Sequence, residues 1–292
     1  MRMNVNVVPV NSAVNTFERI VVALLALGSG VILVYLALEG PLVFSQIRYK
    51  TGDIINNQLV GQDVVNLVVL GPMLIIGGIA LLLRKRVAAF LLLMTPLYLI
   101  YYALSYTIGW EWSSAAYTGN SEAYTFYFLF VLISALVILL YALAIFPKDM
   151  QGTFRKGGLA VYSILFTGFL LIFASMWIRE VLEVQATGTT RGYEIAPTAF
   201  WLVRVFDLGF SIPLGLISVY LLWTRPGSSY PLQYLFYGFF LTMIVAVNAM
   251  GLVMFLNNDP TFMLRDLLVF LALFVILLIG FVYIIRGYTA KT

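Results

Sequence analysis

The sequence predicts an all-α protein: a polytopic membrane bundle of eight transmembrane helices that forms a single transmembrane domain over residues 1–292. Three observations lead to this prediction. The chain is 62% hydrophobic and only 10% charged, with a mean hydropathy of +0.98, whereas soluble domains carry roughly 25% charged residues. Eight apolar segments have the length of a membrane helix, and Lys and Arg gather in alternate connections between them. This composition is typical of a membrane protein.

Each of the eight segments is long enough to cross a bilayer. A helix needs about 20 apolar residues to cross about 30 Å of hydrocarbon, where its backbone polar groups must be satisfied internally. Leu, Ile, Val and Phe fill the segments, and Trp and Tyr collect near their ends, as is typical of the membrane interface. The predicted spans are 17–39, 62–84, 87–108, 122–146, 158–182, 198–223, 231–256 and 262–286.

The basic residues predict the orientation of these spans. If the N-terminus is cytoplasmic, that side receives eleven Lys and Arg residues with two acids, and the far side receives five with ten acids. Because cytoplasmic loops carry the excess of Lys and Arg, we expect both termini in the cytoplasm and the chain in the inner (cytoplasmic) membrane. The polar first sixteen residues lack a signal-peptide pattern, so the first span is expected to act as its own insertion signal.

Two missing residue types exclude several classes of chemistry. The chain has no Cys and no His. Without Cys there are no disulfides or thiolate nucleophiles, and without His the commonest zinc ligand and the usual haem ligand are missing. We therefore expect no cofactor and no metal. The membrane topology accounts for the excess of Lys and Arg on the cytoplasmic side, so we expect no nucleic-acid partner. Membrane lipids are the expected partners. The sequence does not identify a ligand or an oligomeric state.

An offset of 141 residues aligns the second half of the chain with the first without a gap. Three identities fall on this offset: Glu39 with Glu180, Pro72 with Pro213, and Arg84 with Arg225. Because four spans is an even number, the halves would share one orientation, as parallel repeats do. The offset predicts repeats over 17–146 and 158–286. Alternatively, any two sets of membrane helices with similar loops would align as well as this.

The sixth span places Arg204 and Asp207 in an apolar run ahead of Pro213. A charge at the bilayer centre costs about 2.5–3.5 kcal/mol, and less when it is paired or nearer the interface. Since the two charges lie one turn apart on one helix face, we expect an ion pair between Arg204 and Asp207. Pro213 removes a backbone hydrogen bond, so neighbouring helices are expected to satisfy the freed carbonyl.

Polar residues of other spans gather toward the same predicted outer side, whereas the inner halves of the spans are almost purely apolar. We interpret this asymmetry as an outward-opening cavity for a polar or amphiphilic ligand. In the alternative interpretation, most of these residues are ordinary helix-end residues at the interface, and the deeper Arg204, Asp207 and Asn248 form a purely structural lock. The candidate ligand-binding residues are Asp63, Asn66, Tyr102, Tyr106, Glu180, Arg204, Asp207 and Asn248.

Three stretches of the chain carry a resemblance to known proteins: GQDVVNLVVLGP, LIYYALSYTIG and VFDLGFSIPLGLISVYLLWTRP. Together they resemble an uncharacterised group of prokaryotic multi-pass membrane proteins of about eight spans. That group has a similar GQD segment, a Tyr-rich third span and a span with an acidic residue before a central Pro. Because the group has no assigned activity, the resemblance implies a bacterial or archaeal inner membrane, but neither a reaction nor a catalytic residue.

Three classes of function fit these features. The first, which we favour, is a protein that binds or transports a small polar or amphiphilic solute, because intramembrane charges and proline-broken helices are typical of transporters. The second is a membrane enzyme acting on a lipid-linked or extracytoplasmic substrate. In that case Asp207, Asp63 or Glu180 would be the general base and Arg204 would stabilise negative charge. The third is a non-catalytic membrane subunit or sensor.

Overall fold

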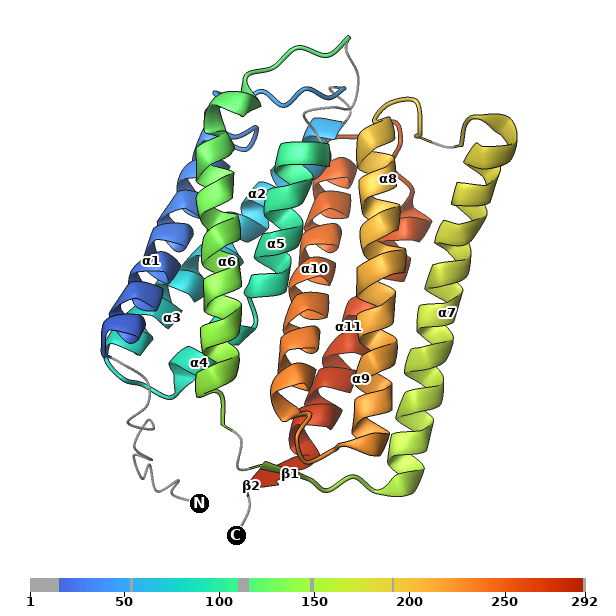
Figure 1. Ribbon diagram of the computed structural model, residues 1–292. Helices are drawn as coiled ribbons and strands as arrows, with labels where there is room; N and C mark the ends of the chain where they lie inside the picture. The colour runs from blue at the N-terminus through green and yellow to red at the C-terminus, as the bar shows by residue number, and fades with distance from the viewer. Residues whose placement is uncertain (1–15, 53–54, 110–115, 148–149, 191, 291–292) are drawn as a thin grey trace.

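The chain is an all-α bundle in the computed structural model, which describes residues 16–52, 55–109, 116–147, 150–190 and 192–290 (Figure 1). Within these residues eight helices are long and apolar enough to cross a membrane, so the protein is a multi-pass membrane protein. The first four spans are α1 (Thr16–Glu39), α2 (Asn56–Val65) with α3 (Gly71–Leu82), α4 (Val87–Leu93) with α5 (Pro96–Leu104), and α6 (Thr125–Ile145). The last four are α7 (Lys156–Thr187), α8 (Pro197–Phe206) with α9 (Ile212–Thr224), α10 (Tyr230–Leu256), and α11 (Leu264–Arg286).

Two predicted spans are longer than expected. The second begins at Asn56 instead of residue 62, and the fifth ends at Thr187 instead of residue 182. Both extra stretches, NNQLVG and EVQAT, mix polar and apolar residues. The hydrophobic pattern marks the part of a helix inside hydrocarbon, and a helix can continue beyond it.

Three spans contain a π-helical segment, and two of these end two residues before a proline. The segment Asn66–Leu70 joins α2 to α3 before Pro72, and Asp207–Ser211 joins α8 to α9 before Pro213. The third, Ser105–Gly109, ends the third span. In the two proline spans, the N–H that follows the π segment bonds five residues back, to Asn66 or to Asp207. The helix therefore adapts locally at the proline, as membrane helices do.

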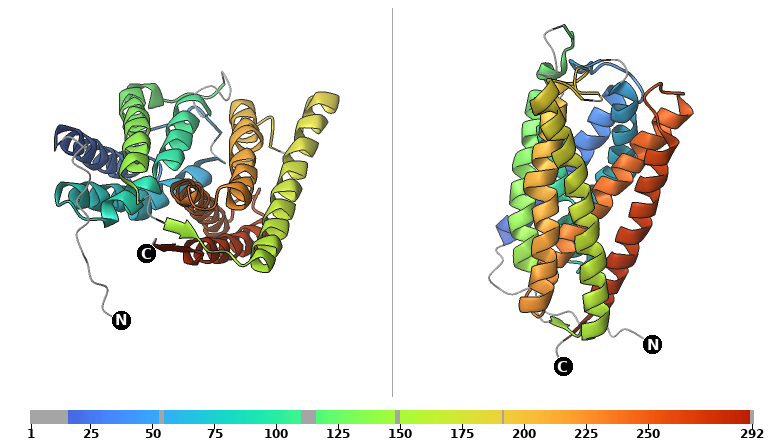
Figure 2. Two further views of the ribbon diagram at one scale, coloured as in Figure 1. Left: turned by 60° about the horizontal axis from the view of Figure 1, so that its bottom comes forward. Right: turned by 90° about the vertical axis from the view of Figure 1, so that its right-hand side faces the viewer.

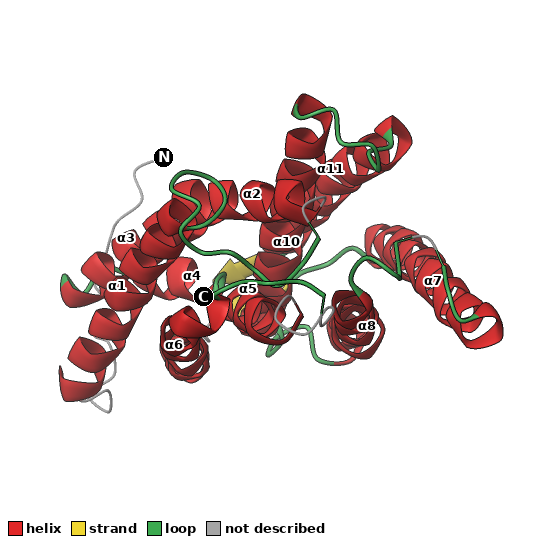
Figure 3. Ribbon diagram, turned by 90° about the horizontal axis from the view of Figure 1, so that it is seen from above, coloured by secondary structure: helices red, strands yellow, loops and turns green. Residues whose placement is uncertain are grey.

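The spans form two groups of four that meet along α2, α5, α8 and α10 (Figures 1 and 3). In each half the first helix packs on the second span: α1 on α3, and α7 on α9. Strand β1 (Met150–Gly152), in the connection between the halves, pairs antiparallel with β2 (Tyr288–Ala290) near the end of the chain. This pair lies at the end of the bundle where α1 begins and α11 ends, which we call the terminal face; the other end is the opposite face (Figures 1 and 2).

Contacts between the halves are reciprocal at the 141-residue offset. Gly61 on α2 packs directly on the backbone of Met250 on α10, so closely that a Cβ at Gly61 would overlap it. In return, a Cβ at Gly109 would lie 2.9 Å from Leu202 on α8. Residues 202 and 250 are the offset counterparts of 61 and 109, and the two proline-linked π segments also begin 141 residues apart. A twofold arrangement predicts this exchange; that the halves arose by duplication stays a prediction.

The two halves differ in how much of each span is buried. In the first four spans, 39% to 61% of the most apolar window is buried inside the protein, against 17% to 28% in the last four. The largest fully buried side chains include Tyr98, Tyr102 and Tyr106 of the third span, and Phe128 of the fourth. Each span of the second half therefore has a smaller share of its residues enclosed by other parts of the chain, although Tyr237 and Phe239 of α10 are also fully buried.

Candidate functional site

A cavity lies among α7, α8, α9, α10 and α11. Its deeper part, which we call the deep chamber, has a volume of about 360 Å³. Aromatic and aliphatic side chains form most of the wall; α7 contributes Phe166, Phe169, Leu170, Phe173 and Trp177, and α10 contributes Phe239, Phe240, Met243, Ile244, Val247 and Met250. The polar lining residues are Gln58, Gln62, Tyr101, Ser105, Arg204, Asp207 and Ser211. An apolar wall with a few polar groups is typical of small-molecule sites.

A second chamber adjoins the first at the opposite face. This rim chamber has a volume of about 390 Å³ and is lined in part by connecting segments, with Ile195 before α8 and Phe262 before α11. Seven residues line both chambers: Gln58, Ala199, Val203, Arg204, Val247, Met250 and Phe270. The two chambers are therefore adjacent, with Arg204 lining both, and together they extend from the opposite face toward the middle of the bundle.

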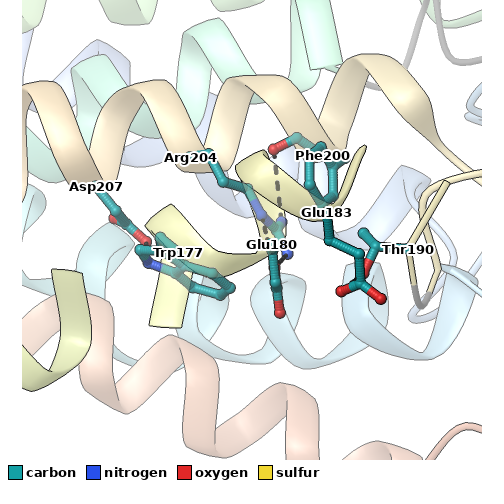
Figure 4. Close-up of polar contacts among 7 residues, drawn as sticks. All are labelled: Trp177, Glu180, Glu183, Thr190, Phe200, Arg204 and Asp207. Carbon is teal, nitrogen blue, oxygen red and sulfur yellow. Dashed lines mark hydrogen bonds and ion pairs between the residues drawn. The ribbon is translucent and has the colours of Figure 1, made fainter. Parts of the chain in front are cut away.

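Arg204 is held by α7 (Figure 4). It forms an ion pair with Glu180, and its Nε donates a hydrogen bond to Glu180 Oε2 over 3.1 Å. The guanidinium carbon lies 4.2 Å from the ring centroid of Trp177 and 3.9 Å from that of Phe200, within range of cation–π attraction. The Arg204 side chain is 14% exposed and that of Glu180 is 32% exposed. The positive charge is thus neutralised and shielded by two rings.

The expected ion pair between Arg204 and Asp207 is not what the structure has. Asp207 instead accepts hydrogen bonds from Trp177 Nε1, over 3.0 Å, and from Ser211 Oγ, over 3.2 Å. Among the described residues, the ion-pair partner of Arg204 is Glu180. The prediction from helical spacing was wrong because the π segment begins at Asp207, and because the neighbouring α7 supplies the nearer carboxylate.

Asp63, Asn66, Tyr102 and Tyr106 lie in the packed core of the first half. All four side chains are at most 1% exposed, and none lines either chamber. Asp63 packs against Gly40, where α1 ends, beside the backbone N–H of Leu42. These residues were expected to share a cavity with Arg204 and Asp207, but the structure separates the two groups because tyrosine rings fill the space between the helices of the first half.

A chain of hydrogen bonds leads from the cavity to this buried group. Gln62, which lines the deep chamber, donates to Tyr98 Oη over 3.0 Å, and Tyr98 Oη donates to Asn66 Oδ1 over 2.9 Å. The Asn66 side chain in turn lies beside the Tyr102 hydroxyl. The buried group is thus linked to the cavity through Gln62 without lining it.

Asn248 joins two helices. Its Nδ2 donates to the carbonyl oxygen of Ile244 over 2.8 Å and to that of Phe270, on α11, over 3.0 Å. Asn248 lines neither chamber. Of the eight candidate residues, the structure therefore places Arg204 and Asp207 at the cavity with Glu180 behind them, the four first-half residues in the core, and Asn248 between α10 and α11.

The sequence interpretation missed the aromatic part of the site. Trp177 and Phe200 enclose Arg204, and Trp177 also binds Asp207. A signal was present: Phe166, Phe169, Phe173 and Trp177 recur at intervals of three and four residues, which places them on one helix face. In an all-apolar span such a stripe is indistinguishable from ordinary core until a cavity is seen beside it.

A polar network fastens the rim of the cavity at the opposite face. Asn57, at the start of α2, donates to Asp259 Oδ2 over 2.7 Å, and Thr261 donates to Asp259 Oδ1 from its N–H and its hydroxyl. Burial opposes ionisation of Asp259, but the hydrogen bonds from Thr261 and Asn57 outweigh it and hold the pKa of this carboxyl below its ordinary value. Since Thr261 and Phe262 line the rim chamber, this network positions its wall.

Neither a cluster of acidic side chains in the described part of the chain nor a similar protein identifies this site. Across the described ranges, no group of three acidic side chains is arranged to hold a metal ion. No family model, curated protein or solved structure matches this chain. Any functional conclusion therefore rests on the cavity itself.

Proposed function

We propose that the protein binds an amphiphilic solute in the cavity of its second half, as a binding or transport protein of a prokaryotic cytoplasmic membrane. In this proposal the terminal face is cytoplasmic and the rim chamber opens to the outside. The orientation is supported by the excess of Lys and Arg at the terminal face. The resemblance to uncharacterised prokaryotic membrane proteins supports the choice of membrane.

One observation carries the proposal: the deep chamber combines a long apolar, aromatic wall with a polar end at Arg204 and Asp207. Its volume of about 360 Å³ falls in the range of roughly 300–1,000 Å³ that small-molecule sites occupy. An amphiphile matches this division, since its apolar part would cover the phenylalanines of α7 while its polar part meets the charged end. A purely polar solute would leave most of that wall uncovered.

The position of the cavity supports a site that a solute enters from outside, or from the outer half of the bilayer, and not an open channel through the bundle. Its lining residues reach from the opposite face to Phe166 on α7 and Leu277 on α11. None of the basic residues of the terminal face is among them. Transport would therefore require a rearrangement that opens the bundle toward the terminal face, as alternating access does.

A cavity-filling variant tests the proposal. Val247 lines both chambers, and its counterpart in the first half is the buried Tyr106. In a background where Trp177 is the one remaining tryptophan, we expect a brominated alkyl-maltoside detergent to quench Trp177 fluorescence. The variant Val247→Tyr should relieve most of this quenching, because the new ring occupies the chamber.

The matched control is Leu252→Tyr, which adds the same ring on α10 at a position that is 50% exposed. It should leave the quenching unchanged. Equal quenching in wild type and Val247→Tyr would contradict the proposal, because the bromine atoms would then reach Trp177 from the lipid side only.

A further inference from the structure

The charges that line the deep chamber are unbalanced. Its charged lining residues, all within the described ranges, are Arg204 and Asp207. Arg204 is already neutralised by Glu180 and covered by two aromatic rings. Arg204 also attracts Asp207 through space, but its ion pair is with Glu180, so Arg204, Glu180 and Asp207 together carry one net negative charge at this end of the chamber.

The partners of Asp207 are both neutral. One oxygen accepts from the Trp177 indole N–H and the other from the Ser211 hydroxyl. A carboxylate offers about four acceptor positions, so half of its capacity is directed elsewhere. A carboxylate in a low-dielectric cavity with only neutral donors favours a positive charge beside it.

The surroundings of Asp207 also favour a cation with apolar substituents. Trp177 and Phe173 line the chamber next to it, with ring centroids 5.4 Å apart, and Tyr101 lines it from α5. Aromatic faces attract organic cations and cover their apolar groups at the same time. A small hydrated metal ion would gain nothing from these walls.

We propose that the amphiphile bound by this cavity is a lipophilic organic cation, with its positive charge beside Asp207 and its apolar substituents against the aromatic wall of α7. This inference rests on the proposed function and adds the sign of the ligand's charge. An anionic ligand would have to displace Glu180 from Arg204 and would place its charge next to Asp207.

Two ions of nearly the same size and shape but opposite charge test the proposal: tetraphenylphosphonium and tetraphenylborate. Binding of each to the purified full-length protein is measured by equilibrium dialysis, for wild type and for Asp207→Asn. Because the two ions partition differently into detergent, the compared quantity is the ratio of affinities between wild type and variant for each ion. For the cation we expect Asp207→Asn to lower affinity at least about tenfold, and for the anion we expect no loss.

Two further variants distinguish an effect of the Asp207 charge on binding from an effect on folding. Asp207→Glu keeps the charge and should keep the preference for the cation. Asp63→Asn removes a buried carboxylate outside the chamber lining and should leave both affinities unchanged. The elution volume and Tm of each variant establish that it is folded.

An equal ratio for both ions, or a larger loss for the anion, would overturn the assignment of a cationic ligand. If neither ion binds while the brominated detergent still quenches Trp177 and Val247→Tyr relieves it, the charge inference fails and the proposed function stands. If neither ion binds and quenching is also insensitive to Val247→Tyr, both fail.

Discussion

The two halves of the molecule contain the same order of spans, yet one is closed and the other holds a cavity. Both have a second span with a π segment before a proline. At the 141-residue offset, the buried Tyr102 and Tyr106 of the first half correspond to Met243 and Val247, which line the deep chamber. Smaller side chains at equivalent positions leave the space that the tyrosine rings fill. A few side-chain volumes therefore separate a packed core from a cavity in this arrangement.

Glycines explain why the helices also stand at different separations. In the first half, a Cβ at Gly30 of α1 would lie 2.7 Å from Ile75 and 2.9 Å from the carbonyl oxygen of Gly71, so α1 and α3 touch at their backbones. The counterparts of Gly30 and Gly71 are Leu171 and Ile212. Small residues permit close helix approach, and this pair of small residues is missing in the second half: Leu171 is 56% exposed, and α7 instead packs on α9 through Leu170 against Gly215.

The largest expected effect comes from giving the first half a bulky residue at this contact. The variant Gly30→Leu, which copies Leu171, should destabilise the protein by about 3 kcal/mol or more, because the added atoms meet backbone that is not free to move. The measurement is the free energy of unfolding in detergent.

Gly168→Leu on α7 is the matched control, since nothing lies within 4 Å of a Cβ there. It should change stability by less than about 1 kcal/mol, in the stabilising direction, because Gly is a poor helix former. Similar destabilisation by both substitutions would show that the closeness of α1 and α3 is not the cause of the difference between the halves.

A second prediction concerns the tyrosine core. The double variant Tyr102→Met, Tyr106→Val gives the first half the side chains of the second and should destabilise it by about 2–4 kcal/mol, because removing buried rings leaves a cavity. Thermal unfolding measures this loss. Tyr220→Met, at a position that is 61% exposed on α9, should cost less than about 0.5 kcal/mol; a comparable loss there would mean that burial of the rings is not what closes the first half.

The smallest expected effect lies in the Asp259 network, where α2 of the first half meets the connection between α10 and α11. Since the pKa of Asp259 is lower in the folded protein than its ordinary value of 3.8, its stabilising contribution is complete above that value and is lost as pH falls through the lower, folded-state pKa. The difference in Tm between wild type and Asp259→Asn should therefore be constant near neutral pH and shrink below about pH 4. A difference that grows as pH falls would contradict this role.

Much of the fold followed from local sequence patterns, whereas the site did not. Spans such as 87–108 and 231–256 agree with the structure within a residue or two, because apolar length is a property of consecutive residues. Arg204 was predicted to pair with Asp207, three residues away, but its partner is Glu180, 24 residues back on another helix. Asp63 and Asn66 were expected at the same depth as Arg204, but they belong to the core of the other half.

Hydrophobicity by itself determined that the chain crosses a membrane eight times, because the cost of placing polar backbone and charge in hydrocarbon acts on each segment separately. Helix rotation and spacing determined which polar groups meet, and these depend on how glycines and tyrosines of different spans fit against one another. Only the tertiary structure therefore separated the closed half from the open one and placed Asp207, hydrogen-bonded to two neutral side chains, on the wall of a cavity.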